Sequence, residues 1–382
     1  PNPLTNVPGV PQGTLLRFFS PTSFNGASLL DALPIIRGNL TAQRGNPNNT
    51  DFSVTNIEAD KQGSVVDTHM PNTSSIDFSL GVQRQVARDF AITADFADRQ
   101  FAHIGGPQIV DLNHFSSARG PVLPICLTEA ERNDPKALCS LGPINLTTGI
   151  GSGNYRGFLL RAEKRFSNGW QLLGSYAYSN SKGNGFGVGF NNDDPLSNFG
   201  PLNTDYRHIL SGSGLVQLPW QFELGIFTTY VSRPPFSVFL NGLDFNGDGT
   251  LGDLLPGTTV NEFNRGMGKA DLQRLVNSFN KTYAGKTDFH GTPIPLVTLP
   301  AHFEFGDPLV TQDLRLSRNF PLGERTHLTL ISEVFNLFNI ANLSGRSGNL
   351  LSRSFGQPKS RVTQVFGSGG PRALQLAARI IF

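Results

Sequence analysis

The sequence predicts an all-β protein, an antiparallel transmembrane β-barrel with long extracellular loops, in which this chain supplies about nine to ten strands of a larger barrel. Three observations predict this class. Apolar and polar residues alternate with a period of two, short and long connections alternate between successive strands, and aromatic residues lie near the predicted strand ends.

The composition suits many strands and polar loops better than a soluble enzyme. Only 38% of the 382 residues are hydrophobic and 16% are charged, while Gly (42), Pro (26) and Phe (30) are abundant. No apolar run has the length of a membrane-spanning helix, whereas a barrel strand needs only about 10 residues with one apolar face. The net charge of +2 indicates no polyanion-binding surface, so we expect no nucleic-acid partner.

Period-2 alternation is clear in residues 76–83, where Ile76, Phe78 and Leu80 are apolar and their neighbours are polar. Such alternation indicates strands whose two faces meet different surroundings. A helical period is weaker throughout, and we expect only a short helix near residues 269–279, inside a loop. The period-2 pattern predicts nine strong strands, near residues 74–88, 89–102, 155–166, 169–181, 205–218, 220–232, 309–320, 325–338 and 371–382.

The connections between these strands alternate strictly in length. Very short turns fall at residues 88–89, 167–169, 218–219 and 321–324, and long connections fall at 103–154, 182–204, 233–308 and 339–370. Short periplasmic turns and long extracellular loops are typical of barrels in the bacterial cell outer membrane, whereas a soluble sandwich would scatter its loop lengths. The last strand is therefore predicted to end at the periplasmic face.

Aromatic residues are placed as an interfacial belt requires. In a soluble protein they would fill the core instead, but these strands carry polar residues along the whole opposite face, which a wet barrel lumen explains better. The aromatic residues near strand ends are Phe90, Phe101, Phe166, Trp170, Trp220, Tyr230, Phe320 and Phe335.

The chain is expected to have two parts. Residues 1–73 are rich in Pro, Asn and Gly and predict a loop-rich extracellular segment, with room for one further strand near residues 14–19. Residues 74–382 are predicted to hold the outer-membrane barrel strands and their loops.

Five segments resemble, in their order and spacing, the C-terminal barrel of TonB-dependent receptors, in particular the Oar-like group. The resemblance covers roughly residues 70–382. The segments are DFSLGVQRQVAR (77–88), NTDYRHILSGSGLVQLPW (203–220), LDFNGDGTLGD (243–253), TQDLRLSRNFPLGERTHLTLISEVFNLFNIAN (311–342) and LQLAARIIF (374–382).

The resemblance implies a barrel of about 22 strands, an internal plug and an N-terminal box that binds an inner-membrane energy coupler. This sequence shows neither plug nor box. We expect the missing strands to come from a missing N-terminal region or from another chain, because an open sheet edge in lipid is very costly. The expected partners are outer-membrane lipid, the TonB-type coupler acting through that missing region, and the barrel assembly machinery.

The C-terminal strand resembles the signal that the assembly machinery reads. Leu376 and Ile380 lie on its apolar phase, and Phe382 gives it an aromatic end. Physically, such a strand can pair with an edge strand of the folding machine. The alternative is an ordinary last strand that ends in Phe by chance.

The longest connection contains a candidate calcium site. Asp244, Asn246, Asp248 and Asp253 offer carboxylate and amide oxygens at near-alternate positions, and oxygen ligands suit Ca²⁺ as a structural cofactor. The spacing is shorter than that of the 12-residue calcium loop. A polar turn without metal remains the alternative.

Two pairs of residues are predicted to be in contact. Cys126 and Cys139 would form a disulfide bond if the protein faces an oxidising space, the alternative being two free thiols. Arg315 and Glu333 lie on the polar phase of adjacent strands and would form an ion pair in the lumen.

These features favour a transporter that takes up a ligand across the outer membrane. The alternatives are a structural or surface-assembly protein and a passive porin-like pore. No nucleophile, base or metal spacing typical of catalysis occurs, so we do not expect an enzyme. The sequence does not identify the ligand, because specificity in such receptors depends on loops and plug.

Overall fold

The computed structural model describes residues 62–66, 71–104, 108–111, 113–117, 119–134, 137–184, 188–362 and 368–382. The strand predicted near residues 14–19 lies outside these ranges. Among the described residues, no helix has the length and apolar character needed to cross a membrane.

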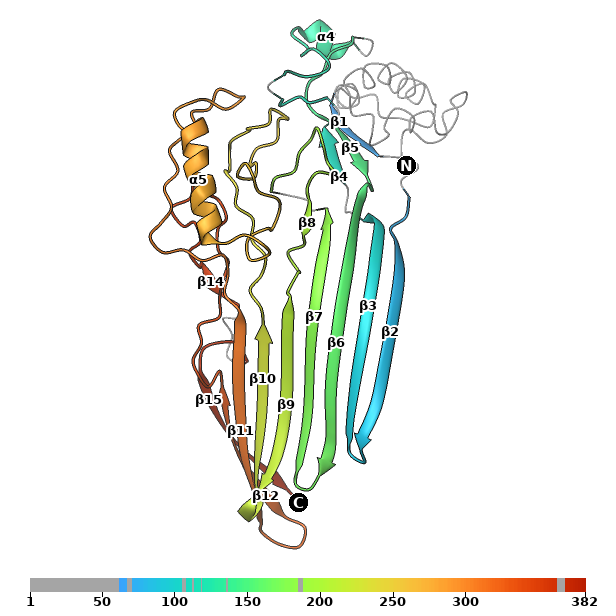
Figure 1. Ribbon diagram of the computed structural model, residues 1–382, viewed down its shortest axis with the longest axis vertical. Helices are drawn as coiled ribbons and strands as arrows, with labels where there is room; N and C mark the ends of the chain where they lie inside the picture. Colours follow the sequence, from blue (N-terminus) through green and yellow to red (C-terminus); the bar gives the residue numbers. More distant parts are fainter. Residues whose placement is uncertain are drawn as a thin grey trace.

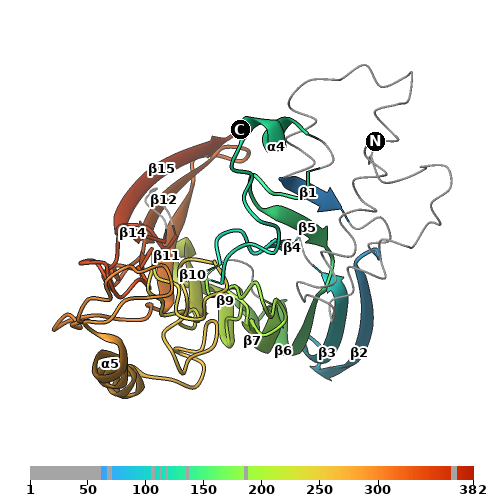
Figure 2. The same cartoon turned by 90° about the horizontal axis from the view of Figure 1, so that it is seen from above.

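The nine predicted strands are present and form one antiparallel sheet, in the order β15-β12-β11-β10-β9-β7-β6-β3-β2, with the short β8 also paired to β7. The sheet is long and strongly curved (Figure 1, Figure 2). It is an open part of a barrel, because β2 and β15 lie at its two edges. The strands are β2 (Ser74–Ala87), β3 (Phe90–Ile104), β6 (Gly151–Ser167), β7 (Trp170–Asn184), β8 (Phe199–Pro201), β9 (His208–Leu218), β10 (Phe222–Val231), β11 (Leu309–Pro321), β12 (His327–Phe335) and β15 (Ala373–Ile381).

The register turns the alternation of each strand into one apolar and one polar face of the sheet. Opposite residues in neighbouring strands share a face. Leu224 pairs with Val216 on one side and Leu316 on the other, whereas Arg315 pairs with Glu333 on the polar phase. Large apolar side chains such as Ile76 and Leu374 are mostly exposed. Among the residues that the structure describes, none form a layer over the apolar face, as expected of a surface that meets hydrocarbon.

The predicted short turns all lie at one end of the sheet. Asn168 and Gly169 join β6 to β7 with positive φ at both positions, which the twist of a tight hairpin favours. Beside this turn, the ammonium of Lys164 lies 2.9 Å from the carboxylate of Asp89 and donates a hydrogen bond to the hydroxyl of Ser167. The two neighbouring hairpins are thus fastened to each other. One further turn contains a short 3-10 helix, η1 (Pro219–Gln221).

The remaining elements lie at the other end of the sheet, in or beside the long connections (Figure 1). The predicted short helix is α5, which runs four residues further than expected, to Tyr283. These elements are β1 (Gly63–Val66), β4 (Gln108–Asp111), α4 (Glu129–Asn133), β5 (Ile144–Thr148), α5 (Lys269–Tyr283), β13 (Leu343–Ser344) and β14 (Ser360–Arg361).

The main hydrophobic core of the described residues lies in the connections rather than on the sheet. It unites the β10–β11 connection with Leu350 and Phe355 of the β12–β15 connection, and the rings of Phe263 and Phe305 lie 4.7 Å apart at its centre. Its buried members are Phe236, Val238, Leu240, Leu243, Leu255, Phe263, Leu272, Val276, Phe279, Ile294, Val297, Phe305, Leu350 and Phe355. The long loops are therefore a folded unit.

Candidate functional site

Four long connections meet above the sheet, and we call them together the loop assembly. They comprise the described residues of 105–150, 185–207, 232–308 and 336–372. Long loops held by a rigid scaffold are where binding residues concentrate. The loop assembly is therefore the candidate site, and its geometry depends on one turn at its centre.

The central turn, residues 244–253, is held by side-chain oxygens that accept hydrogen bonds from its own backbone. Asp244 accepts from the amides of Gly247 and Gly249 at 2.6 and 3.0 Å. Asp248 accepts from the Thr250 amide at 2.7 Å, and Asp253 accepts from the Phe245 amide at 2.6 Å. Such bonds are the means by which Asp favours turns.

The central turn also bonds to two neighbouring connections. Ser117 of the 105–150 connection donates to the carbonyl of Gly247 at 2.6 Å, and the amide of Asn192 donates to the carboxylate of Asp248. The Asn192 side chain in turn exchanges two hydrogen bonds with the backbone of Asp111, at 2.7 and 2.9 Å. Three connections distant in sequence thus converge on one turn.

Backbone geometry explains why glycine occupies position 249. Its φ of 86° is in the left-handed region, and a Cβ at this position would lie 2.6 Å from backbone atoms of Ser116 and Ser117. Only a residue without a side chain allows the two loops to approach so closely.

Ion pairs fasten the rest of the loop assembly. Arg265 and the buried carboxylate of Asp205 approach to 2.7 Å, joining the 232–308 connection to 185–207. Arg346 and Asp307 also approach to 2.6 Å and join 336–372 to the end of 232–308. Because Arg265 and Arg346 have side chains less than a tenth exposed, these bonds are shielded from solvent and constrain the loops strongly.

Burial perturbs the acids of the central turn. Desolvation raises the pKa of Asp253 to about 6, and the nearby charges of Asp248 and Asp244 add to that increase. Burial likewise raises the pKa of Asp248, although hydrogen bonds from Thr250 and Asn192 oppose the shift. The turn therefore holds carboxylates that repel one another when ionised.

The calcium prediction for Asp244, Asn246, Asp248 and Asp253 receives no support from this arrangement. In the described part of the chain, no group of three or more His, Cys, Asp or Glu side chains is arranged to hold a metal ion. The physical reason is that the carboxylates point at backbone amides, and Asn246 accepts from the Asp248 amide at 2.9 Å. The hydrogen bonds match the alternative, a polar turn, and calcium stays a prediction to be tested.

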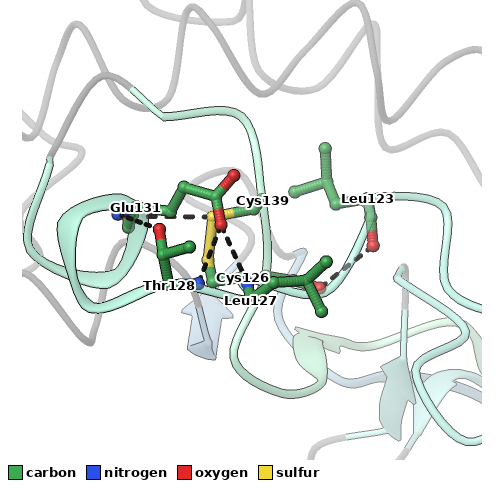
Figure 3. Close-up of a disulfide and its surroundings, with 7 residues drawn as sticks. Leu123, Cys126, Leu127, Thr128, Glu131 and Cys139 are labelled. Carbon is green, nitrogen blue, oxygen red and sulfur yellow. Dashed lines mark hydrogen bonds between the residues drawn. A yellow bond between two sulfur atoms is a disulfide. The ribbon is translucent and has the colours of Figure 1, made fainter.

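Cys126 and Cys139 are joined by a disulfide bond, with 5.0 Å between their Cα atoms (Figure 3). The bond closes a segment that contains α4. Thr128 caps this helix through its hydroxyl, and Glu131 accepts from the amides of Thr128 and Leu127 at 3.0 and 2.9 Å. The disulfide bond and the capping hydrogen bonds of α4 thus both constrain this segment.

The other predicted sites lie on the sheet. The Arg315 and Glu333 side chains are opposite one another in the register, with 3.7 Å between nitrogen and oxygen. At the chain end, Leu376 and Ile380 are exposed on the apolar face of the edge strand β15, and Phe382 is 96% exposed. The assembly-signal role of these three residues stays a prediction.

Sequence reasoning missed the residues that join the loops. Asn192, Asp205 and Arg265 occupy segments without periodicity, and their partners are 56 to 81 residues away. Only the D-x-N-x-D-G pattern pointed to this region, and it was compatible with either a calcium site or a polar turn without metal.

An open antiparallel sheet with an uncovered apolar face, short turns at one end and folded loops at the other defines a bacterial outer-membrane β-barrel. The chain belongs to the family described as outer membrane beta barrel domain, whose model matches residues 11–375. No match was found among curated proteins.

Solved structures that are similar to this chain include outer-membrane receptors. The ferric-catecholate import receptor of Escherichia coli K12 is 13% identical, with a TM-score of 0.42, over 89% of this chain and 31% of the receptor. The ferripyoverdine receptor of Pseudomonas aeruginosa is 9% identical, with a TM-score of 0.42, over 82% and 28%. The ferric yersiniabactin uptake receptor of Yersinia pestis is 13% identical, with a TM-score of 0.31, over 81% and 29%. The chain thus spans about a third of the length of these receptors, over their barrel part.

Proposed function

We propose that this chain is the ligand-binding barrel portion of a TonB-dependent receptor that takes up a ligand across the outer membrane. The observation that carries the proposal is the loop assembly, in which long connections form one hydrogen-bonded unit with its own core above the sheet. A preorganised external surface suits specific capture, since less ordering is lost on binding. The resemblance of residues 77–88, 203–220 and 311–342 to the Oar-like group supports the same proposal.

The proposal describes transport without catalysis. The energy would come from an inner-membrane coupler that contacts the complete receptor on its periplasmic side. The loop assembly contains both acidic and basic groups.

Two measurements on the complete protein separate this proposal from its alternatives. A coupled receptor gives an in-cell crosslink to the energy coupler and no steady ion conductance in a planar bilayer. A passive pore gives conductance without a crosslink. A structural protein gives neither result. Steady conductance that needs no coupler would refute the transport proposal.

The passive pore has one supporting feature. Charged residues such as Arg161, Glu163 and Arg315 line the polar face, as they do in water-filled barrels. Such residues are equally expected around a plug, so the bilayer measurement decides between the two.

A further inference from the structure

Arg318 lies on the apolar face of the sheet, and no ion pair with another described residue neutralises its charge. Arg318 shares this face with Phe222 and Leu330, its partners in the register, and with Phe320, two residues further along β11. A charged side chain facing hydrocarbon is destabilising, most strongly at the bilayer midplane and less near the interfaces. Its presence therefore calls for a compensating interaction.

Two other basic side chains on this face have acidic partners. Lys164 lies 2.9 Å from Asp89, and Arg156 lies 2.7 Å from Asp98. Within the described residues, no carboxylate pairs with Arg318, and its Nε atom is buried without a hydrogen-bond acceptor. The guanidinium instead contacts two aromatic rings, with its Cζ atom 4.9 Å from the centre of the Phe222 ring and 4.5 Å from that of Phe320.

An apolar groove of about 390 Å³ begins beside this guanidinium and crosses β10, β11, β12 and β15. Its shape follows from the register, because the small Ser332 lies between Leu316 and Leu376 and leaves a hollow between two leucines. The rings and leucines around the hollow make its lining almost wholly apolar.

Arg318 lies close to the short-turn end of β11, which the alternation of short and long connections predicts to be periplasmic. Arg318 lies three residues before Pro321, the last residue of β11, and a short turn follows. At roughly 3.4 Å per residue, the Cα atom is about 10 Å from the short-turn end of the strand. A long arginine side chain at that depth can reach the headgroup region of the periplasmic leaflet.

We propose that Arg318 and this groove bind an anionic phospholipid of the periplasmic leaflet. The lipid phosphate would accept hydrogen bonds from the guanidinium and neutralise it, and one acyl chain would occupy the hollow above Ser332. This inference depends on the membrane location of the sheet and is independent of any transport activity.

The test uses the complete protein purified from outer membranes and native mass spectrometry of bound lipid. The probes are palmitoyl-oleoyl phosphatidylglycerol and phosphatidylcholine, which share acyl chains and differ in charge. We expect the wild-type protein to prefer the anionic lipid about fivefold, as one arginine near an anionic surface allows. Arg318→Gln should reduce this preference to about one, whereas Arg318→Lys should retain most of it.

The matched control is Arg84→Gln, because Arg84 occupies the same apolar phase three residues from the end of β2, away from the groove. This control should keep the wild-type preference. Ser332→Leu, which fills the hollow and leaves Arg318 in place, should weaken the binding of both lipids several-fold. Only variants that keep the electrophoretic mobility of a folded barrel are compared.

Three outcomes would overturn the proposal. The first is an unchanged preference for phosphatidylglycerol in Arg318→Gln. The second is a loss of that preference in Arg84→Gln as large as in Arg318→Gln. The third is displacement of phosphatidylglycerol by millimolar inorganic phosphate. The last outcome would assign the guanidinium to a soluble anion instead of a lipid. The proposal also fails if Ser332→Leu binds both lipids as the wild-type protein does, because the acyl chain then does not occupy the groove.

Discussion

Replacing Asp253 by Asn should stabilise the loop assembly at neutral pH. Asp253 is 7% exposed, and its carboxylate accepts a hydrogen bond from the Phe245 amide at 2.6 Å. Burial and the charges of Asp248 and Asp244 raise its pKa to about 6. An Asn side chain is neutral at every pH and keeps an oxygen that can accept the same hydrogen bond.

The sign of the pH dependence follows from linkage. The pKa of Asp253 is higher in the folded state, about 6, than its ordinary value of 3.8, so the folded state holds the proton more tightly. Its contribution to stability is fully present below pH 3.8 and is lost as the pH rises through about 6. The difference between a pKa of 3.8 and one of about 6 corresponds to an upper limit of roughly 3 kcal/mol. We therefore expect Asp253→Asn to gain about 1–3 kcal/mol at pH 7.5 and almost nothing at pH 4.

The assay is native-state hydrogen exchange of the amides in α5 and residues 236–243, corrected for the intrinsic pH dependence of exchange. Asp271→Asn is a control of opposite sign. A backbone hydrogen bond from Gly268 and the ion pair with Arg274 lower the pKa of Asp271, so its stabilising effect is lost as the pH falls. That variant should destabilise α5 at neutral pH and converge with wild type in acid.

The same experiment tests the calcium prediction. If Asp253 and its neighbours bind Ca²⁺, adding the ion at pH 7.5 should stabilise the wild-type loops, and Asp253→Asn should lose that response. If the turn is held by hydrogen bonds alone, calcium and chelator should give the same exchange rates. A destabilised Asp253→Asn in the absence of calcium would refute the electrostatic reasoning.

Three further predictions concern loop docking, loop closure and assembly. Gly249→Ala should destabilise the docking of the loop around Ser116 by about 1–3 kcal/mol, because the φ of residue 249 is positive and its new Cβ would lie against the backbone of Ser116. The measurement is faster proteolysis near Ser116. Replacing Cys126 and Cys139 by Ser should destabilise the segment between them by about 3 kcal/mol, measured by local hydrogen exchange, whereas equal exchange would show that α4 holds the segment unaided. Phe382→Ala should reduce the amount of folded barrel in the outer membrane several-fold without changing the urea midpoint of barrel already folded, and a normal yield would exclude the assembly signal.

The alternation of residues and connections was sufficient to predict the nine strands and the end of the sheet at which the loops lie. The reason is local, since each strand must present one face to hydrocarbon and one to water along its whole length. The segment 76–83 shows this pattern without any knowledge of its neighbours. Helix α5 runs four residues further than predicted, because Tyr283 continues the helical spacing of Val276 and Phe279 and packs against the same core.

The loop assembly was not predictable in the same way. Ser117 and Gly247 are 130 residues apart, and Asn241 bonds to Asn349 across 108 residues. No local pattern specifies which segments meet, so the D-x-N-x-D-G pattern was compatible both with a calcium loop and with a polar turn held by hydrogen bonds. In the structure the carboxylates of the central turn accept hydrogen bonds from backbone amides, which favours the polar turn.

By itself, the sequence determined the strand positions and the identity of the lipid-facing phase, because these depend on alternation within single strands. Tertiary structure alone decided which loops share a core and where Arg318 finds an apolar groove, because both depend on registers and contacts between segments far apart in the chain.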